Sequence, residues 1–174
     1  MKFELQDMTE EQIDKIKTRV EDNSKQIDEI VDGIIQPYCK DLDMYVSFIA
    51  SCLKAGQNPP TNQELEDFCM NLSTYIYFAG GMQENLGIRD DIAKAVYKEV
   101  YNASRASLDK GTVADKDSLA VLQSQEEAII SSAYTRAYKK MKAKVESAQE
   151  LLQSCKKVLS RRMQEVELSM IQTR

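Results

Sequence analysis

Apolar residues recur every three or four positions near the start of the chain, which predicts an amphipathic helix there. Thr9 followed by Gln12 fits a capping box that opens this helix, and Pro37 after Gln36 predicts its end. The seam of the helix consists of Ile13, Ile16, Val20, Asn23, Ile27, Ile30 and Ile34. This spacing is typical of a coiled coil with one polar interruption, which fixes the register or the number of strands. An ordinary amphipathic helix that packs within its own subunit fits the pattern equally well.

Three more helices are predicted before residue 112. The first covers residues 38–54 and is followed by the loop GQNPP. Thr61 and Glu64 form a capping box for the next helix, which either ends at Gly80–Gly81 or uses these glycines to cross another helix closely. The last of the three ends at a turn around residues 109–112. We therefore expect residues 1–57 to form an acidic helical hairpin and residues 58–174 a helical body, either as two units or as a single domain.

The chain has no glycine or proline after Asp117, so we expect one helix of about 55 residues, about 80 Å long at about 1.5 Å per residue. Its apolar stripe comprises Tyr134, Tyr138, Met141, Val145, Ala148, Leu152, Cys155 and Leu159. A lone helix cannot bury such a stripe, which must pack on the other helices, on a second copy, or on both. The contacts expected with a second copy involve Met141, Val145, Leu152 and Leu159. The pattern predicts an all-α, elongated helical bundle with a long, coiled-coil-like C-terminal helix.

Composition agrees with a helical protein of the cytoplasm. The 174 residues include only six glycines and three prolines. No run approaches the roughly 18 apolar residues that span a bilayer, and the N-terminal sequence lacks the basic and apolar regions of a secretion signal. The four cysteines, Cys39, Cys52, Cys69 and Cys155, form no CxxC pair and fall at apolar positions. This usage indicates reduced thiols, and we expect a cytoplasmic protein that is not associated with a membrane.

The charge is distributed unevenly along the chain. The net charge is −5, but residues 1–70 carry −8, residues 71–133 carry −3 and residues 134–174 carry +6. A basic C-terminal segment on an acidic body points to a polyanion, or to an acidic surface on another subunit, as the partner of that segment.

The residue types argue against catalysis. The chain has no histidine and no glycine-rich phosphate loop, which removes the most common general base and the usual routes to nucleotide hydrolysis. The pairs Glu11–Asp14 and Glu29–Asp32 have the spacing with which one helical turn presents two carboxylates to Mg²⁺, as in all-helical nucleotide pyrophosphohydrolases. Acidic pairs of this kind are more often a solvated face. We therefore expect no enzymatic activity, no metal site and no cofactor.

Two clusters combine cations with aromatic rings, which suits single-stranded nucleic acid because cations bind phosphates and rings stack on bases. The upstream cluster contains Lys94, Tyr97, Lys98, Tyr101 and Arg105. The downstream cluster contains Arg136, Lys139, Lys140 and Lys142, with Lys144, around Tyr134 and Tyr138. In the alternative interpretation the tyrosines belong to the core, while the lysines are solvated or pair with the acidic N-terminal helix.

The segments AKAVYKEVYNASR, SLDKGTVADKDS and YTRAYKKMKAKVESAQELLQSCKKVLSRR together resemble the UvsY-type recombination mediators of tailed phages, over roughly residues 65–170. The resemblance implies a small helical homo-oligomer that binds single-stranded DNA and helps a phage recombinase displace the single-strand binding protein in the bacterial host cytoplasm. It places the DNA-binding candidates at Lys94, Tyr97, Lys98, Tyr101 and Arg105.

Our hypothesis is thus a single-stranded DNA-binding accessory factor of recombination or replication that has no active site. The alternative is a helical virion component or adaptor whose basic C-terminal segment docks on an acidic protein partner. Exposed rings at Tyr97, Tyr101, Tyr134 and Tyr138 favour DNA, whereas buried rings favour packing. Charge and stacking do not distinguish DNA from RNA.

Overall fold

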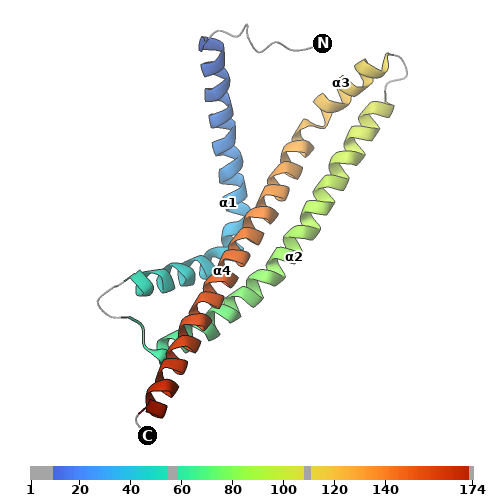
Figure 1. Ribbon diagram of the computed structural model, residues 1–174. Coiled ribbons are helices and arrows are strands. Elements are labelled where there is room, and N and C mark those ends of the chain that lie inside the picture. Colours follow the sequence, from blue (N-terminus) through green and yellow to red (C-terminus); the bar gives the residue numbers. More distant parts are fainter. Residues whose placement is uncertain (1–9, 55–58, 108–110, 173–174) are drawn as a thin grey trace.

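The computed structural model describes residues 10–54, 59–107 and 111–172, and all the regular secondary structure in these ranges is helical. The helices are α1 (Glu10–Lys54), α2 (Asn62–Ala106), α3 (Val113–Gln123) and α4 (Gln125–Gln172). Figure 1 shows that α2 and α4 run side by side as a long hairpin, with α3 continuing the line of α4 at one end. The middle of α1 lies against this hairpin. The all-α, elongated fold expected from the sequence is confirmed, as is its long C-terminal helix.

The first helix does not end at Pro37, as the sequence predicted, but continues through it to Lys54. Proline removes one hydrogen bond and its ring crowds the preceding turn, which bends a helix. Figure 1 shows a sharp change of direction near the middle of α1. Buried residues on both sides of the proline, including Ile35 and Cys39, hold the helix together through the bend. Where a hairpin was expected over residues 1–57, the described residues Glu10–Lys54 therefore form one bent helix. Thr9 and most of the GQNPP loop lie outside the described residues.

The second helix likewise runs uninterrupted through Gly80–Gly81, where the sequence predicted an end or a close crossing. A Cβ atom added at either glycine would meet nothing within 4 Å, so neither position serves a close approach. The buried side chains of Ala79 and Leu86 lie on either side and fix the helix to the core, which outweighs the poor helix propensity of glycine. The capping box of Thr61 and Glu64 is confirmed at the start of α2.

The long C-terminal helix starts earlier than predicted and is interrupted once. Thr112 and Asp115 form a capping box that opens α3, after Gly111 with its positive φ of 134°. Ser124 then separates α3 from α4, with φ −102° and ψ 16°. The backbone N–H and the hydroxyl of Ser124 both donate to the carbonyl of Ala120, at 3.0 and 2.7 Å, so the backbone hydrogen bond persists at the interruption and the side chain adds a second one.

The core is a single apolar cluster to which α1, α2 and α4 all contribute. Ile49, Leu72 and Met141 are inaccessible to solvent. The stripe expected on the C-terminal helix is confirmed as a packing surface, but it faces helices of its own chain. The positions expected to contact a second copy are accordingly placed in or beside this core: Met141, Val145 and Leu152 are buried and Leu159 is half-buried.

Truncating a core leucine is expected to destabilise the whole fold. Leu72→Ala removes a side chain that is 0% exposed, so the free energy of unfolding in urea should fall by about 2–5 kcal/mol. The matched control is Leu122→Ala on α3, because Leu122 is 68% exposed and its loss should cost less than about 0.5 kcal/mol. Equal losses for the two variants would contradict the assignment of the core.

The thiols offer a second test of this packing. Cys39 is 1% exposed, and its Sγ lies 3.0 Å from Sδ of Met141; burial is the main cause that raises the pKa of the Cys39 thiol. We expect Cys39 to react with a thiol reagent at neutral pH only as fast as the chain opens, and Cys52, which is half-buried, to react sooner. Peptide mapping of the labelled protein separates the two sites, and rapid labelling of Cys39 would contradict the fold.

Candidate nucleic-acid interface

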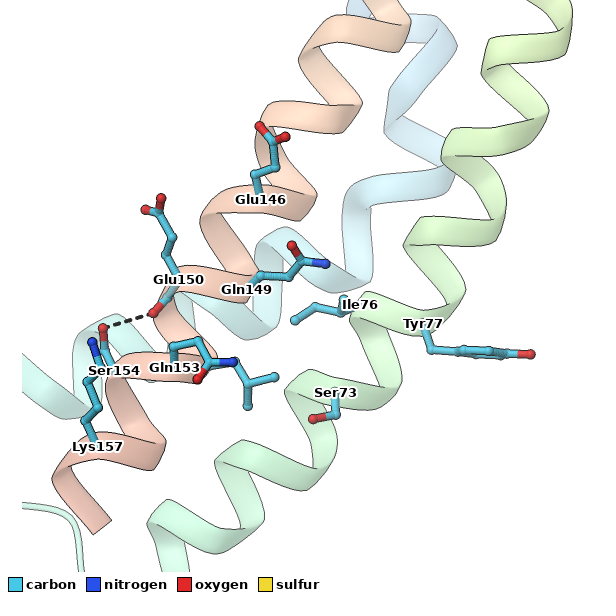
Figure 2. A pocket seen from close by; sticks show the side chains of 10 residues that line it. Ser73, Ile76, Tyr77, Glu146, Gln149, Glu150, Gln153, Ser154 and Lys157 are labelled. Atoms are coloured by element: carbon cyan, nitrogen blue, oxygen red, sulfur yellow. Dashed lines mark hydrogen bonds between the residues drawn. The ribbon is translucent and has the colours of Figure 1, made fainter. Parts of the chain in front are cut away.

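A groove of about 900 Å³ runs between α2 and α4, and none of the predicted binding residues lines it. Figure 2 shows Ser73 and Tyr77 on the α2 side, and Glu146 and Glu150 on α4. Both glutamates are exposed. Within the described residues, no group of three or more His, Cys, Asp or Glu side chains is placed to hold a metal ion. Lys157 of α4 also lines the groove.

The upstream cluster lies near the end of α2 and the downstream cluster in the first half of α4. They meet at Asp90, which is only 5% exposed. Its carboxylate accepts a hydrogen bond of 2.7 Å from Nζ of Lys94, on its own helix, and one of 2.5 Å from the hydroxyl of Thr135 on α4. Burial disfavours ionisation of Asp90, but these two bonds and the charges of Lys94 and Lys139 outweigh it and lower its pKa. Sequence reasoning missed Asp90, although its spacing of four from Lys94 is a visible signal.

The contacts of Asp90 bring lysines of both clusters to one side of the hairpin. Lys139 follows Thr135 by one helical turn and therefore lies on the face of α4 that meets Asp90. Lys142 follows by two turns, and Lys98 follows Lys94 by one turn on α2. Because α2 and α4 run in opposite directions, these four lysines form a strip along the hairpin, about 22 Å from end to end at about 1.5 Å per residue. We call Lys94, Lys98, Lys139 and Lys142 the basic strip.

Arg105, Lys140 and Lys144, which lie outside the basic strip, form ion pairs with aspartates. Arg105 binds Asp117 of α3 at 2.7 Å, and the Tyr101 hydroxyl lies 3.4 Å from the same carboxylate, so both residues tie α2 to α3. Lys140 bonds to Asp32 at 2.5 Å, and Lys144 reaches both oxygens of Asp43 at 2.6 and 2.7 Å.

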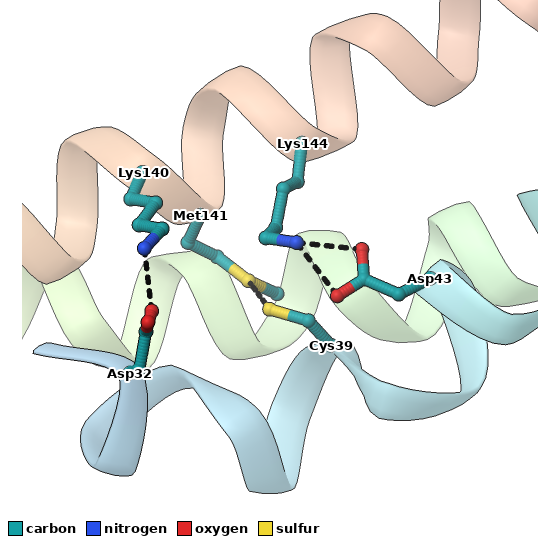
Figure 3. Close-up of polar contacts among 6 residues, drawn as sticks. All are labelled: Asp32, Cys39, Asp43, Lys140, Met141 and Lys144. Atoms are coloured by element: carbon teal, nitrogen blue, oxygen red, sulfur yellow. Dashed lines mark hydrogen bonds and ion pairs between the residues drawn. The ribbon is translucent and has the colours of Figure 1, made fainter. Parts of the chain in front are cut away.

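Figure 3 shows Lys140 and Lys144 side by side on α4, each directed at an aspartate of α1. For these two lysines the structure bears out the alternative interpretation, in which the basic C-terminal segment packs on the acidic N-terminal helix. Asp32 belongs to one of the acidic pairs considered for Mg²⁺, and here it faces an ammonium group.

The aromatic rings are less available than the sequence suggested. Tyr134 and Tyr138 are half-buried and pack against the apolar core. The ring edge of Tyr138 is also the nearest neighbour of Gly87, at 3.4 Å from where a Cβ would lie, so α2 and α4 approach closely there. Tyr97 and Tyr101 are half-buried too, with ring centroids 6.3 Å apart. Tyr97 lies on α2 between Lys94 and Lys98 of the basic strip.

Three predicted cations have no ion pair within 4 Å among the described residues, namely Lys98, Arg136 and Lys139. Lys142 meets Glu146 at 3.9 Å, and both side chains are more than half exposed, so this pair is weak. Arg162, towards the end of α4, has a structural role, because its guanidinium donates to the carbonyl of Pro60 at 2.5 Å and so holds the segment before α2. Sequence reasoning did not anticipate that role.

Neither the family models, the curated proteins nor the solved structures contain a match to the chain. The resemblance to UvsY-type mediators accordingly stays a prediction. None of the described helices combines the length and apolar character that crossing a membrane requires.

The junction at Asp90 predicts a specific response to acid. A carboxyl whose pKa is lowered in the folded state stabilises the fold above its unfolded pKa of about 3.9, and this contribution is lost as the pH falls through the folded value. Asp90→Asn should therefore cost about 1 kcal/mol of unfolding free energy at pH 7. The difference from the unmodified chain should narrow below about pH 4. Urea unfolding at several pH values measures this; a difference independent of pH would contradict the ion pair.

Proposed function

We propose that the chain is a non-enzymatic accessory protein that binds single-stranded nucleic acid along the basic strip. The observation that carries the proposal is the convergence of lysines from α2 and α4 at the buried Asp90. The carboxylate neutralises part of their mutual repulsion, so that the strip can form within an otherwise acidic chain. Lys98 and Lys139 have no ion pair among the described residues and can exchange their counterions for phosphates.

The structure leaves base stacking a smaller contribution to binding than electrostatic capture of phosphates. With Tyr134 and Tyr138 in contact with the core and Tyr101 beside Asp117, Tyr97 remains as the stacking candidate. Electrostatic capture is therefore the larger part of the mechanism. If all four lysines contact phosphates, the logarithm of the affinity for a single strand should fall with a slope of about −3 against the logarithm of salt concentration.

The resemblance to UvsY-type mediators supports a narrower proposal, that the protein helps to load a phage recombinase onto DNA covered by a single-strand binding protein. Such a role requires a protein that holds single strands without catalysis and presents several binding surfaces at once. The cytoplasm of the bacterial host is then its place of action, and the recombinase and the single-strand binding protein are its protein partners.

A second candidate function, a structural or adaptor protein, is favoured by the apolar outer face of α2. Met70, Tyr77 and Phe78 are 71%, 78% and 63% exposed, and the two rings contact each other at a centroid distance of 5.6 Å. Large apolar side chains gathered in this way mark protein interaction sites. In this proposal the exposed lysines of α4 supplement the contact by docking on an acidic partner.

Charge reversal within the strip tests the primary proposal. Fluorescence anisotropy with labelled poly-dT and with a duplex of equal length, each titrated with salt, should show preference for the single strand. The double variant Lys98→Glu, Lys139→Glu should weaken single-strand binding at least tenfold at low salt, because two phosphate contacts become repulsive.

The matched control for this experiment is Lys25→Glu, an exposed lysine of α1 distant from the strip along the chain, which should change the affinity less than twofold. Circular dichroism verifies that each variant keeps its helix content. The absence of binding to either nucleic acid at low salt would overturn the proposal and leave the adaptor function as the one to pursue.

A further inference from the structure

The outer face of α2, on the side away from α4, carries large apolar side chains in solvent. Met70, Tyr77 and Ile88 are 71%, 78% and 58% exposed. Figure 2 shows the ring of Tyr77 extending away from α4. Because a helix turns once in about 3.6 residues, positions that recur in steps of three, four or seven lie along one line of its surface. We call the residues on this line the outer stripe: Met70, Thr74, Tyr77, Gly81, Ile88 and Ile92.

The outer stripe makes α2 apolar on two opposite faces. Its inner face contributes Leu65, Leu72 and Leu86 to the core. An amphipathic helix needs one such face to pack within its own chain, and a helix that is apolar on all sides is normally buried. The second face of α2 therefore has the character of a contact with another polypeptide.

The order of residues along the outer stripe indicates that this polypeptide is a second copy of the chain. Met70 and Ile92 lie at equal distances along the sequence from Gly81, and so do Thr74 and Ile88. An antiparallel copy related by a twofold axis at Gly81 therefore brings Met70 against Ile92. It likewise brings Thr74 against Ile88. The face is thus complementary to itself, as the contact in a twofold dimer has to be.

The charged residues that flank the stripe favour an antiparallel copy over a parallel one. They are all acidic and exposed, and a parallel copy in register would place each of them opposite itself, where like charges repel. In the antiparallel copy each carboxylate lies opposite a neutral residue. The pairs are Glu66 with Val96, Asp67 with Ala95, Glu84 with Phe78, Asp91 with Asn71, and Glu99 with Gln63.

The outer face also offers enough surface for a specific contact. An aromatic side chain buries about 150–250 Å², and Tyr77 and Phe78 are 78% and 63% exposed. With the aliphatic side chains of the stripe added, and each counted in both copies, the contact covers on the order of 1,000 Å², which reaches the size of a biological interface. A Cβ added at Gly81 would meet nothing within 4 Å among the described residues, so the two backbones can approach closely where the helices cross.

We infer that two copies of the chain associate through the outer stripes of α2, antiparallel about Gly81. The basic strip includes Lys94 and Lys98 on one flank of α2, and a twofold axis perpendicular to the helices keeps that flank on the same side in both copies. The inference deepens the proposed function, on which it rests only for its purpose: two strips on one side of a dimer raise the avidity for a long single strand. The apolar face that favours the adaptor function is covered by a second copy in this dimer.

A charge placed in the outer stripe tests the inference by sedimentation velocity without nucleic acid. Ile88→Glu should raise the dissociation constant of self-association at least tenfold, because it puts a carboxylate into the apolar contact. The matched control is Val121→Glu on α3, since Val121 is 57% exposed and Ile88 58%, and this variant should associate as the unmodified chain does. Circular dichroism verifies that both variants keep their helix content.

The two glycines of α2 provide a second test. Alanine has a higher helix propensity than glycine, so Gly80→Ala and Gly81→Ala should both raise the thermal midpoint of the dissociated chain at low concentration. Gly80 lies off the stripe, about 100° around the helix. Only Gly81→Ala should therefore also weaken self-association, at least threefold, because its methyl group enters the crossing.

Cysteine pairs test the direction of the two helices. Under a mild oxidant, Thr74→Cys mixed with Ile88→Cys should form a disulfide-linked dimer, whereas neither variant should link to itself. The unmodified chain, with four thiols of its own, is the background control, and peptide mapping identifies the linked residues.

A chain that stays monomeric at all concentrations would overturn the inference, and so would a link between two Thr74→Cys chains, which requires parallel helices. Unchanged self-association of Ile88→Glu would do the same, because it places the contact elsewhere on the chain. Poly-dT anisotropy on these variants distinguishes this inference from the proposed function. A self-associating chain that binds no nucleic acid refutes the proposed function alone, and a monomeric chain that binds it refutes the inference alone.

Discussion

The fold depends on one contact, the packing of the apolar stripe of α4 against both α1 and α2. Ala137, Met141 and Ala148 are inaccessible on this stripe, and the alternation of small and large side chains lets two neighbouring helices approach it. Without this stripe α2 would have no antiparallel partner, and α1 would keep only its contacts with α2, such as that between the rings of Tyr45 and Tyr75. The positions of the α4 lysines follow from the same packing, because it decides which of them face Asp90 and which face α1.

Much of this arrangement could be predicted from periodicity and capping. The stripe of α4, the capping box at Thr61 and the helical class itself are local properties of the sequence, and the structure confirms them. The ends of the helices were less predictable, because tertiary contacts outweigh the helix-breaking effect of Pro37 and of Gly80–Gly81. The break at Ser124 was not predictable, because a serine that bonds back to the carbonyl four residues earlier, here that of Ala120, has no distinctive signal in the sequence.

The candidate site was predictable in residue type but not in arrangement. The sequence placed Lys139, Lys140, Lys142 and Lys144 in one basic segment, whereas successive turns of a helix distribute such a segment over different faces. Which face each lysine occupies relative to Asp32, Asp43 and Asp90 depends on the crossing of three helices, which no local pattern encodes. Tyr134 and Tyr138 belonged both to the apolar stripe that predicted packing and to the cluster that predicted stacking on bases. Their burial likewise depends on how the helices cross.

The bend in α1 has a consequence for the dynamics of the chain. A single helix of 45 residues combines a segment that contacts the core, from Ile27 onward, with a preceding segment whose apolar side chains Ile13, Ile16 and Val20 are exposed. Its amides should therefore exchange with solvent on two timescales, near the global unfolding rate after Val31 and by local fraying before Ile27. The boundary between these regimes lies within one element rather than in a loop.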